Sequence, residues 1–161
     1  MKTLRIYVDT SVIGGVYDPE FEPWSKGLLE DFRARRYAPV LSDVTAAEVA
    51  KAPEQVRAIH QELLRLGAEA LRVDEEALDL LQAYERRQIL GSRYRNDMLH
   101  IALATVGGVD VVVSWNFKHI VRLDKIRLFN AINLELGYAS LVIYSPREVT
   151  TYEKEDTDPH G

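Results

Sequence analysis

The sequence predicts an α/β fold, a three-layer sandwich in which helices flank a central, mostly parallel sheet. Short apolar runs rich in β-branched and aromatic residues alternate with longer segments whose apolar residues recur at helical spacing. Strands that alternate with helices are typical of a parallel sheet covered on both faces. The run at 109–113 supports this interpretation, because it lacks the regular apolar–polar alternation of a half-exposed strand.

The elements of the N-terminal half follow from local signals. Apolar, β-branched and aromatic runs predict strands, apolar residues three or four positions apart predict helices, and glycine or proline marks the boundaries. In order, these signals predict a strand at 4–8, a helix at about 24–36, a strand at 38–41, a short helix at about 45–52 and a longer helix that begins near Pro53 and ends at Gly67.

The C-terminal half continues the alternation. It is expected to form a strand at 70–73, a helix capped by Asp74, a helix at about 96–106, a strand at 109–113, a helix at about 123–136 and a strand at 141–144. The helix at 96–106 has almost no polar face, so we expect it to be buried against the sheet. Residues 1–152 should form one domain, and the short charged tail at 153–161 is expected to be disordered.

Composition excludes several classes of protein. Of the 161 residues, 47% are hydrophobic and 28% are charged, so the chain is too apolar to stay unfolded and has the length of one domain. It contains no cysteine, which excludes disulfide bonds and thiolate metal sites, and no long uncharged apolar run that would span a membrane. The N-terminal apolar run is too short and too interrupted for a signal peptide, so we expect a cytoplasmic protein.

The formal net charge of −5 argues against a protein that coats nucleic acid without specificity. Four acids and one lysine after Tyr152 contribute −3 of this charge, so the rest of the chain is close to neutral. Arginines and lysines also occur in clusters, which makes a local positive face compatible with an acidic total. Taken alone, such clusters are more often solvated helix faces.

Three acids and one amide stand where a site is expected in this fold. In a parallel α/β sheet the site lies beyond the carboxyl ends of the strands, near the point where the strand order reverses. Asp9 follows the first predicted strand, Glu48 lies in the helix after the second, Asp97 opens the buried helix and Asn116 follows the strand at 109–113. The fold would therefore bring all four residues to one edge of the sheet.

Each of these residues has a structural alternative. Asp9 and Asn116 are residue types that favour turns and caps. Glu48 completes a capping box with Thr45, in which its carboxylate would bond back to the start of its own helix, and for Glu48 alone this interpretation is the better one. Asp97 would stabilise a helix start through the dipole, but its helix has hardly any other polar residue, so we favour a site role.

Clustered carboxylates repel one another and persist mainly where a cation or a shared proton compensates them. Oxygen ligands, with no cysteine and no histidines at zinc spacing, favour Mg²⁺ or Mn²⁺. Such a cation orients water and neutralises charge on a phosphodiester, so these residues point to hydrolysis at phosphate. The glycine-rich phosphate loops and the serine-hydrolase elbow are absent from the sequence.

Four segments resemble the PIN domain in their order and spacing. They are 7–12 (YVDTSV), Ser42 with 47–49 (AEV), 96–104 (NDMLHIALA) and 111–117 (VVVSWNF). The resemblance runs from about residue 4 to residue 146. The chain is similar to the stand-alone PIN proteins that occur as VapC-type toxins of prokaryotic toxin–antitoxin pairs.

The resemblance implies a PIN-like fold and an Mg²⁺- or Mn²⁺-dependent endoribonuclease. It places Asp9, Glu48 and Asp97 in the acidic site as metal ligands, with Asp9 and Asp97 the most direct, and it gives Ser11 and Ser114 supporting roles. It also implies an RNA substrate, a small antitoxin protein as partner and a homodimer. We expect no membrane partner, because the chain has no long uncharged apolar run.

The sequence departs from the family pattern at Asn116, where the fourth acid would fall. An amide oxygen still ligates a cation or holds a water, but it supplies no negative charge. We therefore expect one well-occupied metal ion and a second that binds only with substrate phosphate. The alternative is a catalytically weak PIN-fold module that binds RNA or a partner protein.

Aromatic and basic residues next to the acids are candidates for RNA contact. Trp115 would stack on bases, and Lys118, Arg93 and Arg95 would contact phosphates. Core packing is the alternative for the aromatic residues, and we favour it more for Phe117 than for Trp115.

Overall fold

The structure is a computed structural model that describes residues 2–153. Its strands form one five-stranded sheet with the order β3-β2-β1-β4-β5, and every pair of neighbours is parallel. The strands are β1 (Leu4–Val8), β2 (Tyr37–Ser42), β3 (Glu69–Leu71), β4 (Val111–Val113) and β5 (Ile143–Tyr144). The predicted three-layer α/β sandwich is confirmed, with a sheet that is parallel throughout the described residues.

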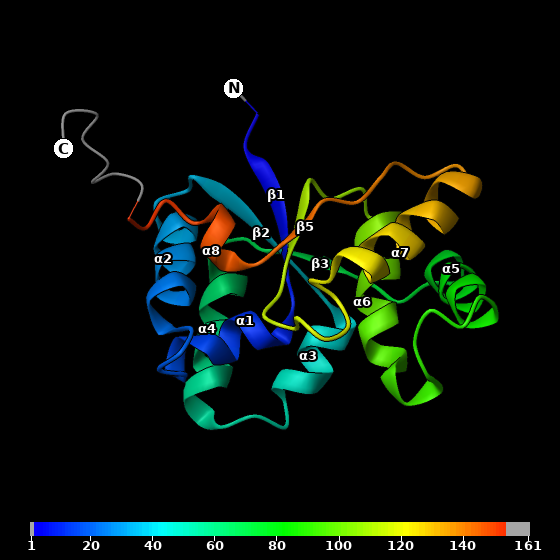
Figure 1. The fold of residues 1–161 in the computed structure, drawn as a ribbon. Helices are drawn as coiled ribbons and strands as arrows, with labels where there is room; N and C mark the ends of the chain where they lie inside the picture. The colour runs from blue at the N-terminus through cyan, green and yellow to red at the C-terminus, as the bar shows by residue number, and fades with distance from the viewer. Residues whose placement is uncertain (1, 154–161) are drawn as a thin grey trace.

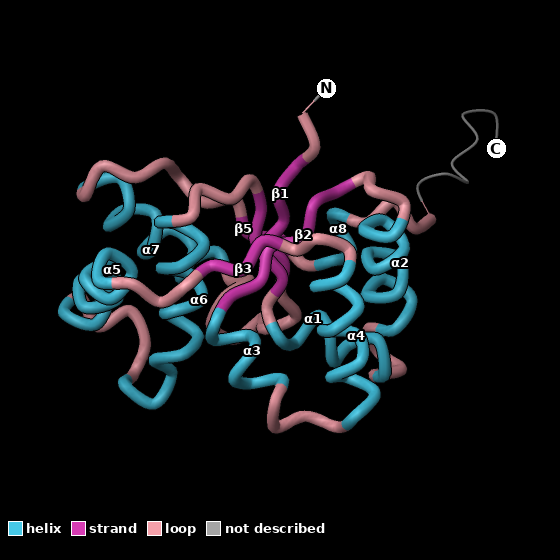
Figure 2. Tube along the Cα trace, turned by 180° about the vertical axis from the view of Figure 1, so that it is seen from behind, coloured by secondary structure: helices cyan, strands magenta, loops and turns pink. Residues whose placement is uncertain are grey.

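Helices cover both faces of this sheet (Figures 1 and 2). On one face lie α5 (Glu75–Arg86), α6 (Arg95–Val106) and α7 (Leu123–Glu135). On the other lie α1 (Thr10–Gly14), α2 (Glu22–Arg33), α4 (Glu54–Arg65) and α8 (Pro146–Val149). The helix α3 (Asp43–Val49) lies at the end of the sheet where β2 stops.

Side chains that alternate along the central strands feed two separate cores. Tyr7 and Val40 pack with α5, α6 and α7, whereas Ile6, Val8 and Leu41 pack with α1, α2 and α4. The helix α6 is buried along most of its length, as its apolar sequence predicts. Full burial of one such aliphatic side chain stabilises the fold by roughly 1.5–3 kcal/mol, so the two cores hold the three layers together.

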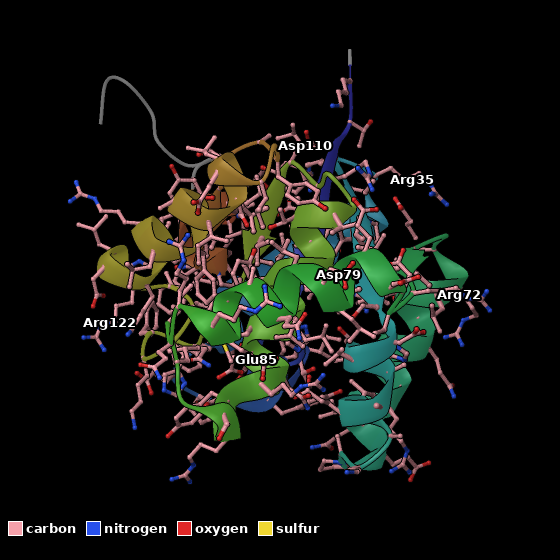
Figure 3. The ribbon with its side chains drawn as sticks, turned by 90° about the vertical axis from the view of Figure 1, so that its right-hand side faces the viewer. Arg35, Arg72, Asp79, Glu85, Asp110 and Arg122 are labelled. Atoms are coloured by element: carbon pink, nitrogen blue, oxygen red, sulfur yellow. The ribbon has the colours of Figure 1, made fainter. Side chains whose placement is uncertain are left out.

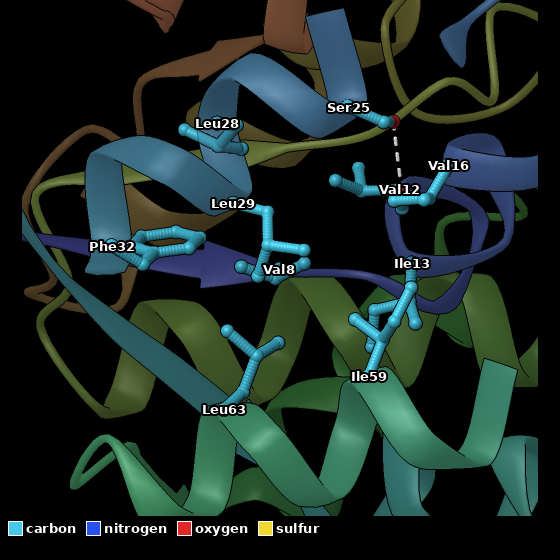
Figure 4. Close-up of a pocket in the computed structure, with 10 residues that line it drawn as sticks. All are labelled: Val8, Val12, Ile13, Val16, Ser25, Leu28, Leu29, Phe32, Ile59 and Leu63. Carbon is cyan, nitrogen blue, oxygen red and sulfur yellow. Dashed lines mark hydrogen bonds between the residues drawn. The ribbon is translucent and has the colours of Figure 1, made fainter. Parts of the chain in front are cut away.

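The second core contains one small apolar cavity, shown in Figure 4. Its volume is about 10 Å³, which is space for about one water molecule. Ser25 lies on its wall and donates a hydrogen bond of 2.8 Å to the carbonyl oxygen of Val12. This cavity is a packing defect of the core and has no room for a substrate.

Two local predictions at the sheet edge are wrong. The local signals predict no helix between residues 9 and 23, but residues 10–14 form α1, which Asp9 caps by accepting from the backbone N–H of Ser11. The helix α3 begins at Asp43 and not near Thr45, because Ser42 is its N-cap and accepts from the Thr45 N–H. The capping box predicted for Glu48 therefore does not form. The strands β3, β4 and β5 are shorter than predicted.

The end of the described chain is anchored on α2. Asp31 is fully buried and accepts hydrogen bonds from the Thr150 hydroxyl at 2.8 Å and the Thr151 N–H at 3.1 Å. Residues 154–161, which make up nearly all of the tail predicted to be disordered, lie outside the described residues. Within residues 2–153, no helix combines the length and hydropathy that a membrane crossing needs.

Candidate active site

The strand order reverses at β1, because β2 and β4 lie on opposite sides of it. The carboxyl ends of β1 and β4 are paired at Val8 and Val113, and the Asp9 N–H donates to the Val113 carbonyl oxygen at 3.3 Å. The helices α1 and α3 and the first turn of α6 gather at this end of the sheet (Figure 1). A ligand is expected at such a reversal in an open parallel sheet.

Asp9 is buried at this reversal and is held by two serines. Its Oδ1 accepts from the N–H of Ser11 at 2.9 Å and from the Ser11 hydroxyl at 2.5 Å, and its Oδ2 accepts from the Ser114 hydroxyl at 2.8 Å. Burial raises the pKa of Asp9, although the charge of His100 and the serine hydrogen bonds act in the opposite direction. The ionised carboxylate is therefore costly in this position unless a positive charge compensates it.

Glu48 turns away from its own helix start and joins a buried chain of hydrogen bonds. Its Oε1 accepts from the Thr10 hydroxyl at 3.0 Å and lies 2.6 Å from Nε2 of His100. The other ring nitrogen of His100, Nδ1, lies 2.5 Å from the Tyr7 hydroxyl, which is 2.7 Å from the Ser42 hydroxyl. This chain links the sheet, α3 and α6 through polar atoms inside the protein.

The same contacts set the charge of the pair. Burial alone lowers the pKa of His100, but the Tyr7 hydroxyl, the hydrogen bond to Glu48 and the nearby charge of Asp9 raise it above its usual value. Burial likewise opposes ionisation of Glu48, but its hydrogen bond to His100 and the charge of that ring lower the pKa of the carboxyl group. Both shifts favour a protonated imidazole beside an ionised carboxylate.

Asp97 and Asn116 form the other side of the site. The Asp97 Oδ2 accepts from Nδ2 of Asn116 at 3.3 Å and lies 3.0 Å from Nδ1 of His119. The amide oxygen of Asn116 accepts from the backbone N–H groups of Lys118 at 3.2 Å and His119 at 2.9 Å. Asn116 is thus a turn residue, as one alternative predicted, and it also contacts Asp97.

Hydrogen bonds connect the predicted residues into one network. The Asn116 N–H donates to the Ser114 hydroxyl at 2.9 Å, so the contacts run from Asp97 through Asn116 and Ser114 to Asp9. Glu48 meets this network through Thr10, the residue next to Asp9. All four candidate residues therefore lie at one edge of the sheet, although their role as site residues stays a prediction.

The candidate site offers carboxylate oxygens, which are the type of ligand that a hard divalent cation prefers. The carboxylates of Asp9, Glu48 and Asp97 are oxygen donors, and the desolvated carboxylate of Asp9 is the group that most needs a cation. Within residues 2–153, however, no group of three or more histidine, aspartate or glutamate side chains lies in an arrangement that would hold a metal ion. Glu48 and Asp97 are held by histidines, so both would have to turn to join Asp9 around one ion.

Sequence reasoning missed the roles of His100 and His119. His100 lies three positions after Asp97 on α6, a spacing that favours a local helix contact, but its ring instead reaches Glu48. His119 contacts Asp97 and also packs on Tyr94, with ring centroids 3.9 Å apart. The spacing of histidines that bind zinc does not reveal a histidine that pairs with a distant carboxylate.

The burial of the two aromatic residues after β4, Trp115 and Phe117, is the opposite of the prediction. Trp115 is buried, with its indole N–H donating to the Ser25 hydroxyl at 2.8 Å, whereas Phe117 is 50% exposed. The preference for core packing at Phe117 is therefore wrong. The Phe117 N–H donates to the Trp115 carbonyl oxygen at 3.0 Å, so the chain turns directly after Trp115.

The basic residues predicted to contact RNA surround this edge. Lys118 and Arg93 are exposed, and the Arg93 guanidinium lies 5.3 Å from the centre of the Tyr94 ring. Arg95 lies 3.9 Å from a carboxylate oxygen of Glu85. Contact of these side chains with RNA stays a prediction.

Asp110 lies at the opposite end of β4 (Figure 3), where it accepts from the Arg5 N–H at 2.8 Å and pairs with Lys2 at 3.3 Å. Since the carboxyl ends of the strands form the candidate site, Asp110 does not replace the acid that is missing at Asn116.

Comparisons with known proteins bear on the family and the fold. The family model for the PIN domain matches residues 6–125. No curated protein matches the chain by sequence. Among solved structures, the chain is similar to VapBC2 from Rickettsia felis bound to a DNA fragment from their promoter, with a TM-score of 0.56 and 13% identity over 88% of this chain and 98% of that one. It is also similar to FitAcB from Neisseria gonorrhoeae, with a TM-score of 0.55 and 18% identity over 88% and 98% of the two chains. At these identities the structural likeness shows the fold alone.

Proposed function

Because the chain belongs to the PIN domain family, whose members are generally nucleases, we propose that it is a metal-dependent endoribonuclease with Asp9, Glu48 and Asp97 as its acidic site. The observation that carries the proposal is the buried carboxylate of Asp9 at the reversal of strand order, linked by hydrogen bonds to the side of the site that holds Asp97. A desolvated carboxylate at that position calls for a cation.

Each residue of the proposed acidic site has its own role. Ser11 and Ser114 hold both oxygens of Asp9 in one orientation, and His100 favours the ionised form of Glu48. Asp97 stands across the site at the start of α6. Mg²⁺ or Mn²⁺ held by these acids would offset the negative charge that develops on the phosphodiester.

The partners of the protein are part of the proposal. The structural neighbours carry the names of VapBC2 and FitAcB complexes, and the sequence resembles VapC-type toxins. We therefore propose that the chain is the toxin of a toxin–antitoxin pair, that a small antitoxin protein holds it inactive and that it forms a homodimer.

A second candidate is a PIN-fold module that binds RNA or a partner protein with little cleavage. The observation that favours it is Asn116, because its amide oxygen is occupied by two backbone N–H groups and adds no negative charge to the site. The pairing of Glu48 and Asp97 with histidines points the same way, since both carboxylates would have to change partners to bind a cation.

Cleavage of a mixed single-stranded RNA by the purified protein, free of antitoxin, separates the two candidates. We expect cleavage with Mn²⁺ or Mg²⁺, no cleavage in EDTA, and none with Asp9→Asn. Asp79→Asn is the matched control, because this exposed acid lies on α5 (Figure 3), outside the candidate site, and should cleave like the wild type. If wild type and Asp9→Asn release the same trace of product, the binding module is correct. A gain of activity in Asn116→Asp would show that the amide limits the reaction.

A further inference from the structure

We propose that a pocket next to the candidate active site binds one nucleobase of a single-stranded RNA by stacking, an inference that rests on the proposed function. The pocket lies between the start of α2, the turn after β4 and the start of α8, and its volume of about 390 Å³ falls within the range of about 300–1,000 Å³ typical of small-molecule sites. Its walls include four aromatic side chains and one arginine: Phe21, Trp24, Trp115, Phe117 and Arg147.

The aromatic wall is rigid on one side and open on the other. Phe21 stacks on Trp115 with ring centroids 4.2 Å apart and an angle of 14° between the ring planes. Trp115 is fixed by the hydrogen bond from its indole to Ser25, so this stack is preorganised. Phe117 lies 6.1 Å from Trp115 and stays half exposed. Exposed aromatic side chains are groups on which the bases of a single strand stack, and Phe117 offers such a ring.

The polar groups of the pocket favour a base over a phosphate inside it. Glu20 and Glu148 are on its wall, and Glu148 already accepts from the N–H of Ser145 at 2.9 Å, so the interior would repel a second anion. The Arg147 guanidinium lies 4.9 Å from the centre of the Trp24 ring. This cation suits a phosphate that stays outside while the neutral base enters.

Trp24 supplies a second, independent sign of a ligand. Its indole Nε1 is the one buried side-chain nitrogen or oxygen within residues 2–153 that has no hydrogen-bond partner. Native proteins rarely leave a buried donor unpaired. Nucleobases carry carbonyl oxygens and ring nitrogens, which are the acceptor types that this donor lacks.

Hydrogen bonds through Ser11 link the pocket wall to the acidic site. The Ser11 hydroxyl donates to Asp9 and accepts from the backbone N–H of Trp115 at 2.9 Å. Ser114, which holds Asp9, directly precedes Trp115 of the pocket wall, so the proposal places a base in the pocket next to a phosphate at the acids. By holding one base, the pocket would determine which phosphodiester bond of a single strand lies at the acids. It would accept any base, because every base has a π-face.

Tryptophan fluorescence tests the proposal directly, because Trp24 and Trp115 are the two tryptophans of the chain and both line the pocket. A short single-stranded oligoribonucleotide should quench the fluorescence of the wild-type protein saturably in EDTA. A strand of equal length without bases should not quench it. Asp79→Asn should quench like the wild type, since this exposed acid lies on α5 and does not line the pocket.

Substitutions at Phe117 separate stacking from folding. Phe117→Ala should weaken RNA binding by about 5- to 150-fold, from the measured worth of one stacked base, and Phe117→Tyr should restore it because the ring remains. Tyr152→Ala, which removes an aromatic ring of similar exposure that does not line the pocket, should bind like the wild type. Melting curves of the variants should coincide, since the Phe117 ring is half exposed.

The outcomes distinguish this inference from the proposed function. Saturable quenching without any cleavage would support the base pocket and reject the nuclease. Cleavage with no quenching, or with equal quenching by the strand without bases, would overturn the base pocket and leave the nuclease standing. Equal binding by wild type and Phe117→Ala would also overturn it.

Discussion

Replacing Tyr7 by phenylalanine removes one hydroxyl that two buried side chains share. The hydroxyl lies 2.5 Å from Nδ1 of His100 and 2.7 Å from the hydroxyl of Ser42. Tyr7 is 0% exposed, His100 2% and Ser42 3%, so water does not reach these groups when the hydroxyl is lost. The ring of Tyr7 stays in place, and the substitution therefore creates no large cavity.

The expected loss of stability in Tyr7→Phe follows from the number of buried polar groups that lose a hydrogen-bond partner. Nδ1 of His100 loses its hydrogen bond, whereas Ser42 keeps the bond that its hydroxyl accepts from the Thr45 N–H. One orphaned buried polar group costs about 1–3 kcal/mol, and the partly satisfied serine adds less, so we expect a loss of about 2–3 kcal/mol. That is a large fraction of the stability of about 5–15 kcal/mol typical of a single domain.

Urea unfolding of Tyr7→Phe beside Tyr138→Phe measures this loss. The Tyr138 hydroxyl also makes one hydrogen bond, of 2.7 Å to Glu76, but this bond lies at the protein surface, where water replaces it. The control should therefore lose less than about 1 kcal/mol. We expect equal slopes and a lower midpoint for Tyr7→Phe. Equal free energies of unfolding for the two variants would refute the buried network as a source of stability.

The same variant has a second readout if the chain is a nuclease. The network positions His100, and His100 holds Glu48, so the substitution should lower kcat more than it changes KM. An unchanged kcat would show that Glu48 does not depend on this chain of hydrogen bonds.

Three further predictions concern stability. Gly15→Ala should destabilise the fold by about 1–3 kcal/mol, because the added Cβ would lie 2.5 Å from the Ser25 hydroxyl oxygen and 2.7 Å from the Trp115 indole nitrogen. Gly14→Ala is the control, because its Cβ would meet open space, and it should be neutral or slightly stabilising. Equal melting temperatures of the two variants would contradict this prediction. Glu62→Gln should lower the free energy of unfolding by up to about 1 kcal/mol at pH 7, because the hydrogen bond from Arg33 lowers the pKa of the Glu62 carboxyl group below 4.5. This contribution is present above pH 4.5 and disappears as the pH falls through the folded-state pKa. A loss in urea unfolding that persists at pH 3 would exclude this origin. Asp31→Ala should cost about 3 kcal/mol and release the segment at 150–152 to proteolysis, and an unchanged cleavage pattern would show that other contacts hold it.

Local signals predict the elements whose own residues stabilise them. The helix after Asp74 begins where predicted, because the carboxylate of Asp74 accepts from the Ala77 N–H at 2.8 Å, an interaction within four residues. Gly67 and Gly137 have φ values of 90° and 91°, the left-handed conformation that the predicted helix ends require. These contacts are close in sequence, so a pattern of residue types is enough to identify them.

The helix α1 shows where such signals fail. Five residues are too few for a helix that is stable by itself, because its first turn is costly to form. Its cap on Asp9 and the burial of Val12 and Ile13 in the second core stabilise it in the folded protein. The interpretation of Glu48 failed for a related reason, since its hydrogen bond to His100 joins residues 52 positions apart.

The sequence by itself determined the parallel α/β architecture, the family and the edge of the sheet at which Asp9, Glu48, Asp97 and Asn116 gather, because strand order and residue type carry that information along the chain. Only the tertiary structure decided how those side chains are paired, that histidines hold two of the acids, and that Trp115 is buried while Phe117 faces solvent. Such pairings depend on the packing of helices and turns from distant parts of the chain, and no spacing within one segment encodes the geometry between segments.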